Sequence, residues 1–247
     1  ESVTIPPTVN IIERSAFLNC PVLKTVTFEK ESTLAEIGDK AFANCSRLTA
    51  VTIPASVVSI GDKAFFDCLR LQSVTFQKES KLTEIGYEAF ANCAISTVTI
   101  PASVVSIGKF TFMNCHELQN ITFEDGSKLE NIGNVAFANC SRLTKVTIPA
   151  SVANIGYKAF LCCFGLETVT FKTRSKLTEI GQGAFKYCTS LTKVEIPASV
   201  VSIGDEAFEL CNSLTEVEIP ASVKSIGKEA FFDCAGLEQV TIKDETT

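Results

Sequence analysis

The chain of 247 residues contains a single histidine, His116, and lacks the motifs on which most catalysis depends. His116 lies in the turn N-C-H-E-L, where other stretches carry Ser46, Leu69 or Ser141, so we interpret it as a solvated surface residue. With no Asp or Asn placed to orient it, a Cys-His or Ser-His nucleophile is not supported, and no glycine-rich phosphate-binding phrase is present. We expect neither an enzyme nor a cofactor. A pair of catalytic carboxylates among the scattered glutamates is left open as a remote hydrolase alternative.

Positive charge and long apolar runs are also scarce. Lysine and arginine form no evident cluster, and the net charge is −6 with a pI of about 5.0. The electrostatic footprint of a nucleic-acid-binding protein is therefore missing, and attraction to an anionic membrane surface is disfavoured. No apolar run approaches the roughly 18 residues that span a bilayer, and Glu1 opens directly into the repeats without a leader. We expect a mature chain or a segment of a longer one, with no nucleic-acid partner and no membrane insertion.

The sequence is rich in repetition. The phrase V-T-I/F recurs from Val3 to Val240 at spacings of 23 to 25 residues. Self-similarity at this period is typical of a solenoid, in which each unit contacts only its neighbours. Apolar residues make up 46% and charged residues 20%, which suits a continuous core. We predict a single solenoid domain over residues 1–247, made of about ten repeats of 23–25 residues without evident caps.

Each unit contains the phrase L-x-x-V-x-I/F, a turn, and then S/L-x-x-I-G-x-x-A-F-x-x-C. The first phrase alternates with period two and predicts a strand with one buried face, whereas G-D-K-A-F-F-D-C predicts a single helical or 3₁₀ turn. The glycine recurs in nine units, which suggests a positive φ or a close approach between coils. Short units such as 53–74 alternate with longer ones such as 28–51. Two short units follow one another only from Ile196.

Eleven cysteines are present, and ten share one repeat position: Cys20, Cys45, Cys68, Cys93, Cys115, Cys140, Cys163, Cys188, Cys211 and Cys234. A linear file of parallel side chains cannot converge four sulfurs on a zinc ion. Disulfides between adjacent coils fit the Cα spacing but not the Cβ separation that a disulfide prefers. We interpret the file as small buried hydrophobes. Cys162 lies one position earlier and is the candidate for an exposed thiol.

The phrase I-P-x-S-V-x-x-I-G-x-x-A-F-x-x-C-x-x-L-x-x-V-T-I, well matched at 148–169, 196–217 and 219–240, closely resembles the treponemal-type, or BspA-like, leucine-rich repeat. The resemblance covers essentially the whole chain. It implies a right-handed, horseshoe-like leucine-rich-repeat solenoid with a parallel β-sheet on its concave face. It also implies an extracellular or cell-surface protein that adheres to host proteins or other cells. Because missing caps would leave strand edges open, a building block that stacks end to end remains the alternative.

The predicted strand positions also point to a binding surface. The exposed column at the centre of the strands consists of threonine except at Glu195 and Glu218. Charged and polar residues adjoin these two in neighbouring columns: Lys145, Lys193, Glu216, Glu238 and Gln239. We expect this departure from the repeat to bind a protein partner, either a host or cell-surface protein or a second copy of the chain. The sequons at Asn44, Asn120 and Asn139 matter only if the protein follows a eukaryotic secretory route.

Overall fold

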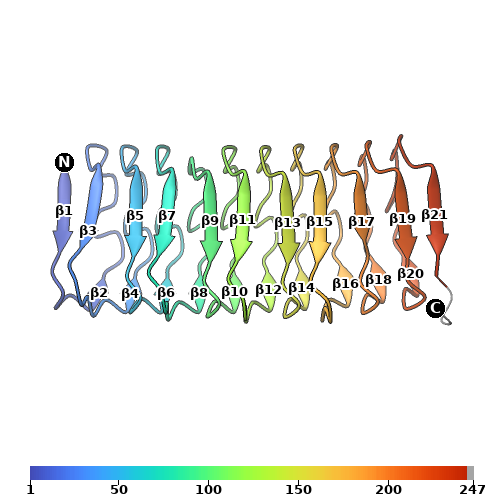
Figure 1. Ribbon diagram of the computed structural model, residues 1–247. Helices are drawn as coiled ribbons and strands as arrows, with labels where there is room; N and C mark the ends of the chain where they lie inside the picture. Colours follow the sequence, from blue (N-terminus) through green and yellow to red (C-terminus); the bar gives the residue numbers. More distant parts are fainter. Residues whose placement is uncertain (244–247) are drawn as a thin grey trace.

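The computed structural model describes residues 1–243, which form a row of stacked coils with two parallel sheets along its length (Figure 1). The eleven strands of the first sheet within these residues are β1 (Ser2–Ile5), β3 (Thr25–Phe28), β5 (Ala50–Ile53), β7 (Ser73–Phe76), β9 (Thr97–Ile100), β11 (Asn120–Phe123), β13 (Lys145–Ile148), β15 (Thr168–Phe171), β17 (Lys193–Glu195), β19 (Glu216–Ile219) and β21 (Gln239–Ile242). The second sheet is built from two-residue strands: β2 (Ile11–Ile12), β4 (Glu36–Ile37), β6 (Ser59–Ile60), β8 (Glu84–Ile85), β10 (Ser106–Ile107), β12 (Asn131–Ile132), β14 (Asn154–Ile155), β16 (Glu179–Ile180), β18 (Ser202–Ile203) and β20 (Ser225–Ile226). The predicted solenoid is confirmed.

The period-two pattern decides which side of each strand is buried. In β5, Val51 and Ile53 are buried and Thr52 is exposed. Each coil returns the chain in the same direction, so neighbouring strands are parallel and equivalent residues face each other, for example Val51 with Val74. Hydrophobic residues therefore stack into continuous files inside the solenoid, while the polar residues of the eleven-stranded sheet form its outer face.

The third side of each coil contains no helix in the described residues, so the predicted helical turn is wrong. Residues 61–68 instead form successive β-turns, in which the amide of Phe66 donates to the carbonyl of Lys63 at 3.1 Å. The intervening amides point to the next coil, as Phe65 donates to Ala89 at 2.8 Å. Lys63 has a φ of 57°, and this left-handed residue reverses the helical path. Hydrogen bonds between coils thus replace those that a helix would make within itself.

The recurrent glycine is required by the close approach of adjacent coils and not by a left-handed turn. A Cβ on Gly133 would lie 2.5 Å from the carbonyl carbon and oxygen of Gly108 in the preceding coil. The positive φ values fall elsewhere in the coil, for instance on Lys40 and Asn44. Asparagine suits that second position because its short polar side chain tolerates the left-handed conformation. Of the two readings of the glycine, the contact between coils is confirmed.

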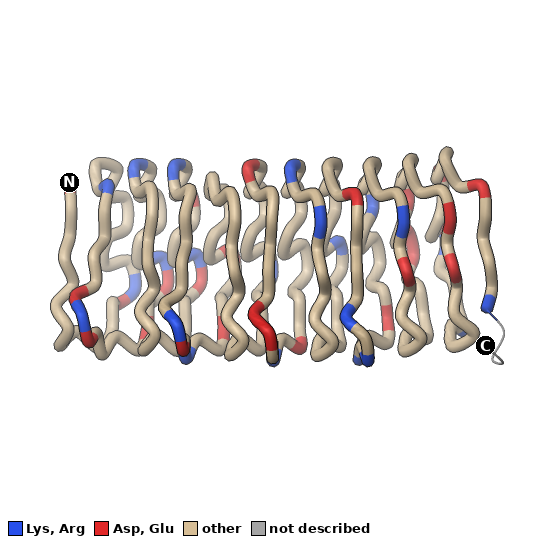
Figure 2. The backbone as a smooth tube through the Cα atoms, viewed as in Figure 1, with Lys and Arg blue, Asp and Glu red and all other residues tan. Residues whose placement is uncertain are grey.

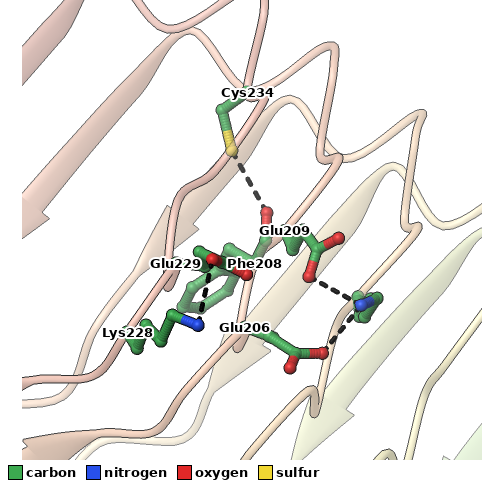
Figure 3. A network of polar contacts seen from close by, with 7 residues as sticks. Glu206, Phe208, Glu209, Lys228, Glu229 and Cys234 are labelled. Carbon is green, nitrogen blue, oxygen red and sulfur yellow. Dashed lines mark hydrogen bonds and ion pairs between the residues drawn. The ribbon is translucent and has the colours of Figure 1, made fainter.

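Two files of side chains fill the core beside this turn. Phenylalanine rings stack from Phe17 to Phe231, with centroids 5.0–5.4 Å apart and planes within 11° of parallel. Next to them, the thiol at the repeat position of each coil from Cys45 to Cys234 donates to the phenylalanine carbonyl of the preceding coil at 3.1–3.3 Å. Figure 3 shows the last of these bonds, from Cys234 to Phe208. All eleven cysteines are free thiols.

The first sheet opens after every long coil. Strands β5 and β7 pair through all four residues, whereas β7 and β9 pair only through Ser73 and Thr97. The cause is the long bend, in which ten positions separate Phe28 from Gly38 while eight separate Ile53 from Gly61. The extra residues push the following coil away at the carboxyl end of its strand. Wedges therefore recur along one edge of the first sheet.

Candidate partner-binding hollow

The last wedge opens into a hollow of about 370 Å³. It is bounded by residues 171–175 of the last long coil, by residues 195–199 of the next coil, and by Glu218, Pro220 and Lys243. We call it the C-terminal hollow. Two of its residues, Glu195 and Glu218, belong to the patch that the sequence predicts.

The hollow exists because two short coils follow one another. In earlier doublets the short coil is covered by the next long bend, as where Gln77 Oε1 accepts the amide of Ala55 at 3.1 Å. The coil that begins at Ile196 is followed by another short coil, so its Ala198 is exposed. Ile196 itself is 8% exposed, compared with 0% for the equivalent Ile53. A break in the repeat order has thus become an opening in the surface.

Charged residues gather on the C-terminal strands of the first sheet, as Figure 2 shows, whereas the first-sheet strands from β1 to β11 carry none. Glu195 and Glu218 face each other in register across β17 and β19. Each has a lysine nearby: Lys243 Nζ lies 2.7 Å from Glu218 Oε2, and Lys193 Nζ lies 3.5 Å from Glu195 Oε1. The hydrogen bond from Lys243 lowers the pKa of Glu218. The carboxylate of Glu218 is therefore held ionised on an exposed surface.

The rest of the predicted patch lies outside the hollow. Lys193 forms its closest ion pair with Glu216 at 2.9 Å, and that hydrogen bond raises the pKa of Lys193. Glu216, Glu238 and Gln239 line a separate open depression of about 400 Å³ at the start of β19 and β21. Lys145 on β13 is separated in register from Lys193 by Thr168. The structure thus brings together two of the seven predicted side chains in the hollow and places three in the depression.

Sequence reasoning missed the basic side of the hollow. The bend at 172–176 carries Lys172, Arg174 and Lys176, three cations in five residues, so the statement that lysine and arginine do not cluster needs correction. The other long bends place acidic residues in this segment: Glu29 and Glu31, Glu79, and Glu124 and Asp125. Aligning the four long units with one another would have exposed the difference. The basic bend contributes to the hollow only because folding places it beside Glu195.

A second charged cluster lies on the turn side of the same coils (Figure 3). Carboxylate oxygens of Glu206, Glu209 and Glu229 lie within 4.8 Å of one another. Lys186 Nζ lies 2.7 Å from Glu206 Oε2 and 2.6 Å from the largely buried Glu209. Hydrogen bonds with Glu206 and then Glu209 raise the pKa of Lys186 well above its usual range. The lysine already supplies the positive charge, so Lys186, Glu206 and Glu209 form a partly buried structural ion-pair network.

His116 borders a shallow hollow where the turn Cys93-Ala94-Ile95 has lost a residue. Cys93 also borders it, but burial raises the pKa of its thiol, and Sγ donates to the carbonyl of Phe65. A thiol that is protonated and already hydrogen-bonded is no nucleophile. The geometry around the single histidine therefore does not assemble a Cys-His site.

Cys162 is half-buried instead of fully exposed, and burial raises the pKa of its thiol. It interrupts a ladder of side-chain amides that links successive coils: Asn139 Nδ2 donates to Asn114 Oδ1 at 2.7 Å, and Asn114 Nδ2 donates to Asn92 at 2.8 Å. At the other sequon positions, the amide of Asn44 donates to Asn19, and Asn120 lies half-buried in β11. Two of the three sequon amides are thus engaged in contacts between coils.

The sequence profile described as BspA type leucine rich repeat region, six copies, matches residues 1–118, 35–167, 83–199 and 178–247. These stretches overlap and together span the chain. This chain belongs to the BspA-type leucine-rich repeat family. Proteins with such repeats typically mediate protein interactions. No protein of curated function matches the sequence.

Three of the solved structures that are similar to this chain come from bacteria. A leucine rich cell surface protein from Faecalibacterium prausnitzii is 30% identical, with 99% of this chain and 79% of that chain covered and a TM-score of 0.50. The pneumococcal vaccine antigen PcpA is 27% identical, with 99% and 62% covered and a TM-score of 0.64. A leucine-rich repeat protein from Bacteroides ovatus is 27% identical, with 97% and 78% covered and a TM-score of 0.57. The BspA-type chain thus spans less than two thirds of PcpA.

Among the described residues of this BspA-type chain, no helix has the length and apolar character that a bilayer span requires.

Proposed function

We propose that this protein is a non-catalytic, extracellular or cell-surface module that binds another protein through the C-terminal part of its eleven-stranded face. The observation that carries the proposal is the convergence of Glu195 and Glu218 with a basic bend at the one place where the repeat order changes. The family typically mediates protein interactions, and one similar structure is a cell surface protein. The rest of the solenoid surface repeats from coil to coil, whereas the C-terminal hollow occurs where the repeat order changes. This difference favours the hollow as the site of specific recognition.

The face also suits a protein partner physically. It is rigid, because each strand is hydrogen-bonded to its neighbours and backed by a buried core. Threonine hydroxyls bond across strands on the neutral half, as between Thr52 and Thr75 at 2.9 Å. Exposed charges on the other half set the rate and specificity of association more than its affinity. A pre-organised surface of this kind loses little entropy on binding.

The test is a binding screen against arrayed extracellular-matrix and cell-surface proteins, with the variant Glu195→Thr/Glu218→Thr as control. Thr occupies the same column in the other strands, so the variant keeps the fold. A genuine partner should associate more slowly with the variant and with a weaker salt dependence. Equal association rates for both proteins would place the binding surface elsewhere, for which the bends around 29–32 and 77–80 are the next candidates.

End-to-end assembly is the second candidate function. It is favoured by exposed apolar side chains on the last described coils, where Phe232 is 57%, Val240 52% and Ile242 70% exposed. Sedimentation velocity over a range of concentrations separates the two functions. A monomer at every concentration argues against assembly, whereas a series of growing rods that Phe232→Ser and Ile242→Ser abolish supports it.

A further inference from the structure

The C-terminal hollow has cations on one side and carboxylates on the other. The bend of the last long coil contributes Lys172 and Arg174, and the two short coils that follow contribute Glu195 and Glu218. Between the charges lie apolar groups, among them Ile196 and Pro197 of the coil that no long bend covers. A ligand that fills the hollow must therefore offer both signs of charge along a short path.

The ion pairs inside the protein show which charges remain available. Lys243 pairs with Glu218 at 2.7 Å, and Lys172 reaches away to Asp125 at 3.0 Å. Arg174 forms no ion pair with any residue between 1 and 243, and Glu195 is 3.5 Å from Lys193, beyond good hydrogen-bond distance. The guanidinium of Arg174 and the carboxylate of Glu195 are thus the two least satisfied charges of the hollow.

We propose that the C-terminal hollow binds an extended peptide segment of mixed charge, with an acidic side chain on Arg174 and a basic side chain on Glu195. This inference rests on the proposed protein-binding function and names the partner's chemistry. Arginine presents paired N–H donors that match the two oxygens of a carboxylate. Arg174 and Glu195 lie on opposite sides of a strip of apolar groups. Successive side chains of an extended peptide point to opposite sides, so a peptide bound along the strip can present one side chain to Arg174 and the next to Glu195.

A peptide of mixed charge fits better than a uniform polyelectrolyte. A polyanion such as a sulfated glycan would meet Glu195, Glu218 and a net charge of −6. A polycation would meet the bend at 172–176. Like charges that face each other across an interface weaken binding. The carboxylates of the hollow therefore repel a polyanion, and the basic bend repels a polycation.

The experiment measures fluorescence anisotropy of short labelled peptides with the intact chain at low and at moderate salt. The set comprises a peptide of alternating Glu and Lys, an all-Glu peptide, an all-Lys peptide and a heparin fragment. We expect the alternating peptide to bind most tightly, and Arg174→Glu to weaken it by about tenfold. The substitution is matched, because Glu31 and Glu79 occupy the same bend position with φ of 58°, close to the 60° of Arg174.

A graft provides the converse control. Gln77→Lys/Glu79→Arg places a basic bend in the second long coil, where no strand of the first sheet carries a glutamate and the carboxylate of Glu124, on the next long bend, already accepts the amide of Ala102 at 2.9 Å. The graft should leave peptide binding unchanged. The proposal fails if Arg174→Glu has no effect on the alternating peptide, or if heparin or either uniform peptide binds more tightly. One outcome separates the two proposals. If Arg174→Glu does not change the affinity for the alternating peptide, while Glu195→Thr/Glu218→Thr still lowers the association rate of a partner found by the screen, the protein-binding function is supported and the mixed-charge proposal is wrong.

Discussion

The thiol of Cys140 donates a hydrogen bond to the carbonyl oxygen of Phe112 in the preceding coil at 3.3 Å. The same oxygen accepts the amide of Cys115 at 3.3 Å, so one carbonyl links two coils. A carbonyl has two lone pairs, and in a dry core the second would otherwise remain unused. The repeated cysteine is therefore a polar link as well as a small hydrophobe. Alanine would fill the space but could not donate.

Thiol chemistry provides the first prediction. Burial raises the pKa of Cys45 to about 11 and of Cys115 to about 12, so almost no thiolate exists near neutral pH. Native protein should therefore react with iodoacetamide only at the three half-buried thiols, Cys20, Cys162 and Cys234. The other eight should react after denaturation, as read by peptide mass spectrometry. Disulfides in the native protein, or early modification of Cys140, would contradict this arrangement.

The close approach of coils leads to the second prediction, on glycine. Gly133→Ala should destabilise the protein by more than about 2 kcal/mol. The new Cβ would lie 2.5 Å from the backbone of Gly108, and neither of the two adjacent coils can move away without breaking the hydrogen bonds between coils. Gly126→Ala is the control, since no atom lies within 4 Å of its Cβ. Its positive φ of 75° should cost about 1–2 kcal/mol. Urea unfolding measures both, and a larger loss at Gly126 would show that backbone conformation dominates.

The third prediction concerns pH and the ion pair of Lys186. Its hydrogen bond lowers the pKa of Glu206, so the stabilisation is present above the usual carboxyl pKa and is lost as the pH falls through the lowered value. In Lys186→Met, Glu206 and the buried Glu209 would lack their cation. The variant should therefore lose most stability near neutral pH, and the loss should shrink at about pH 3, as the pH falls through the lowered pKa of Glu206.

Urea midpoints for Lys186→Met and the unmodified chain at both pH values test this. Lys172→Met, at the exposed ion pair with Asp125, is the control and should change the midpoint little at either pH. A loss at Lys186 that is equal at both pH values would show that packing, and not charge, is responsible.

The binding surface could be found from the sequence only in part. Glu195 and Glu218 stand out because they interrupt a column of threonines, and the column follows from the period of the strand. Arg174 stands out only when the four long units are aligned with one another, and even then a bend has no period that predicts where its side chain points. Its neighbours follow from the order of long and short coils, which the structure converts into an opening beside Glu195.

The turns show the same limit. The phrase G-D-K-A-F-F-D-C has helix-like spacing, and sequence reasoning could not foresee that two residues of each such phrase take a left-handed conformation. That conformation is unfavourable in an isolated chain. It is stabilised because it turns backbone amides towards the next coil, where they donate hydrogen bonds to carbonyls, as Phe65 donates to Ala89. A contact between coils thus overrides the local preference.

The sequence by itself determined the solenoid, its parallel sheets and the files of Phe and Cys. Each repeat position must stack on its own copy, so a pattern of 23 to 25 residues fixes which residues become neighbours. Only the tertiary structure decided the turn conformations, the ion partners of Lys193, Lys243 and Lys186, and the C-terminal hollow. These depend on distances of a few ångströms between different positions of adjacent coils, and the repeat pattern alone does not fix such distances.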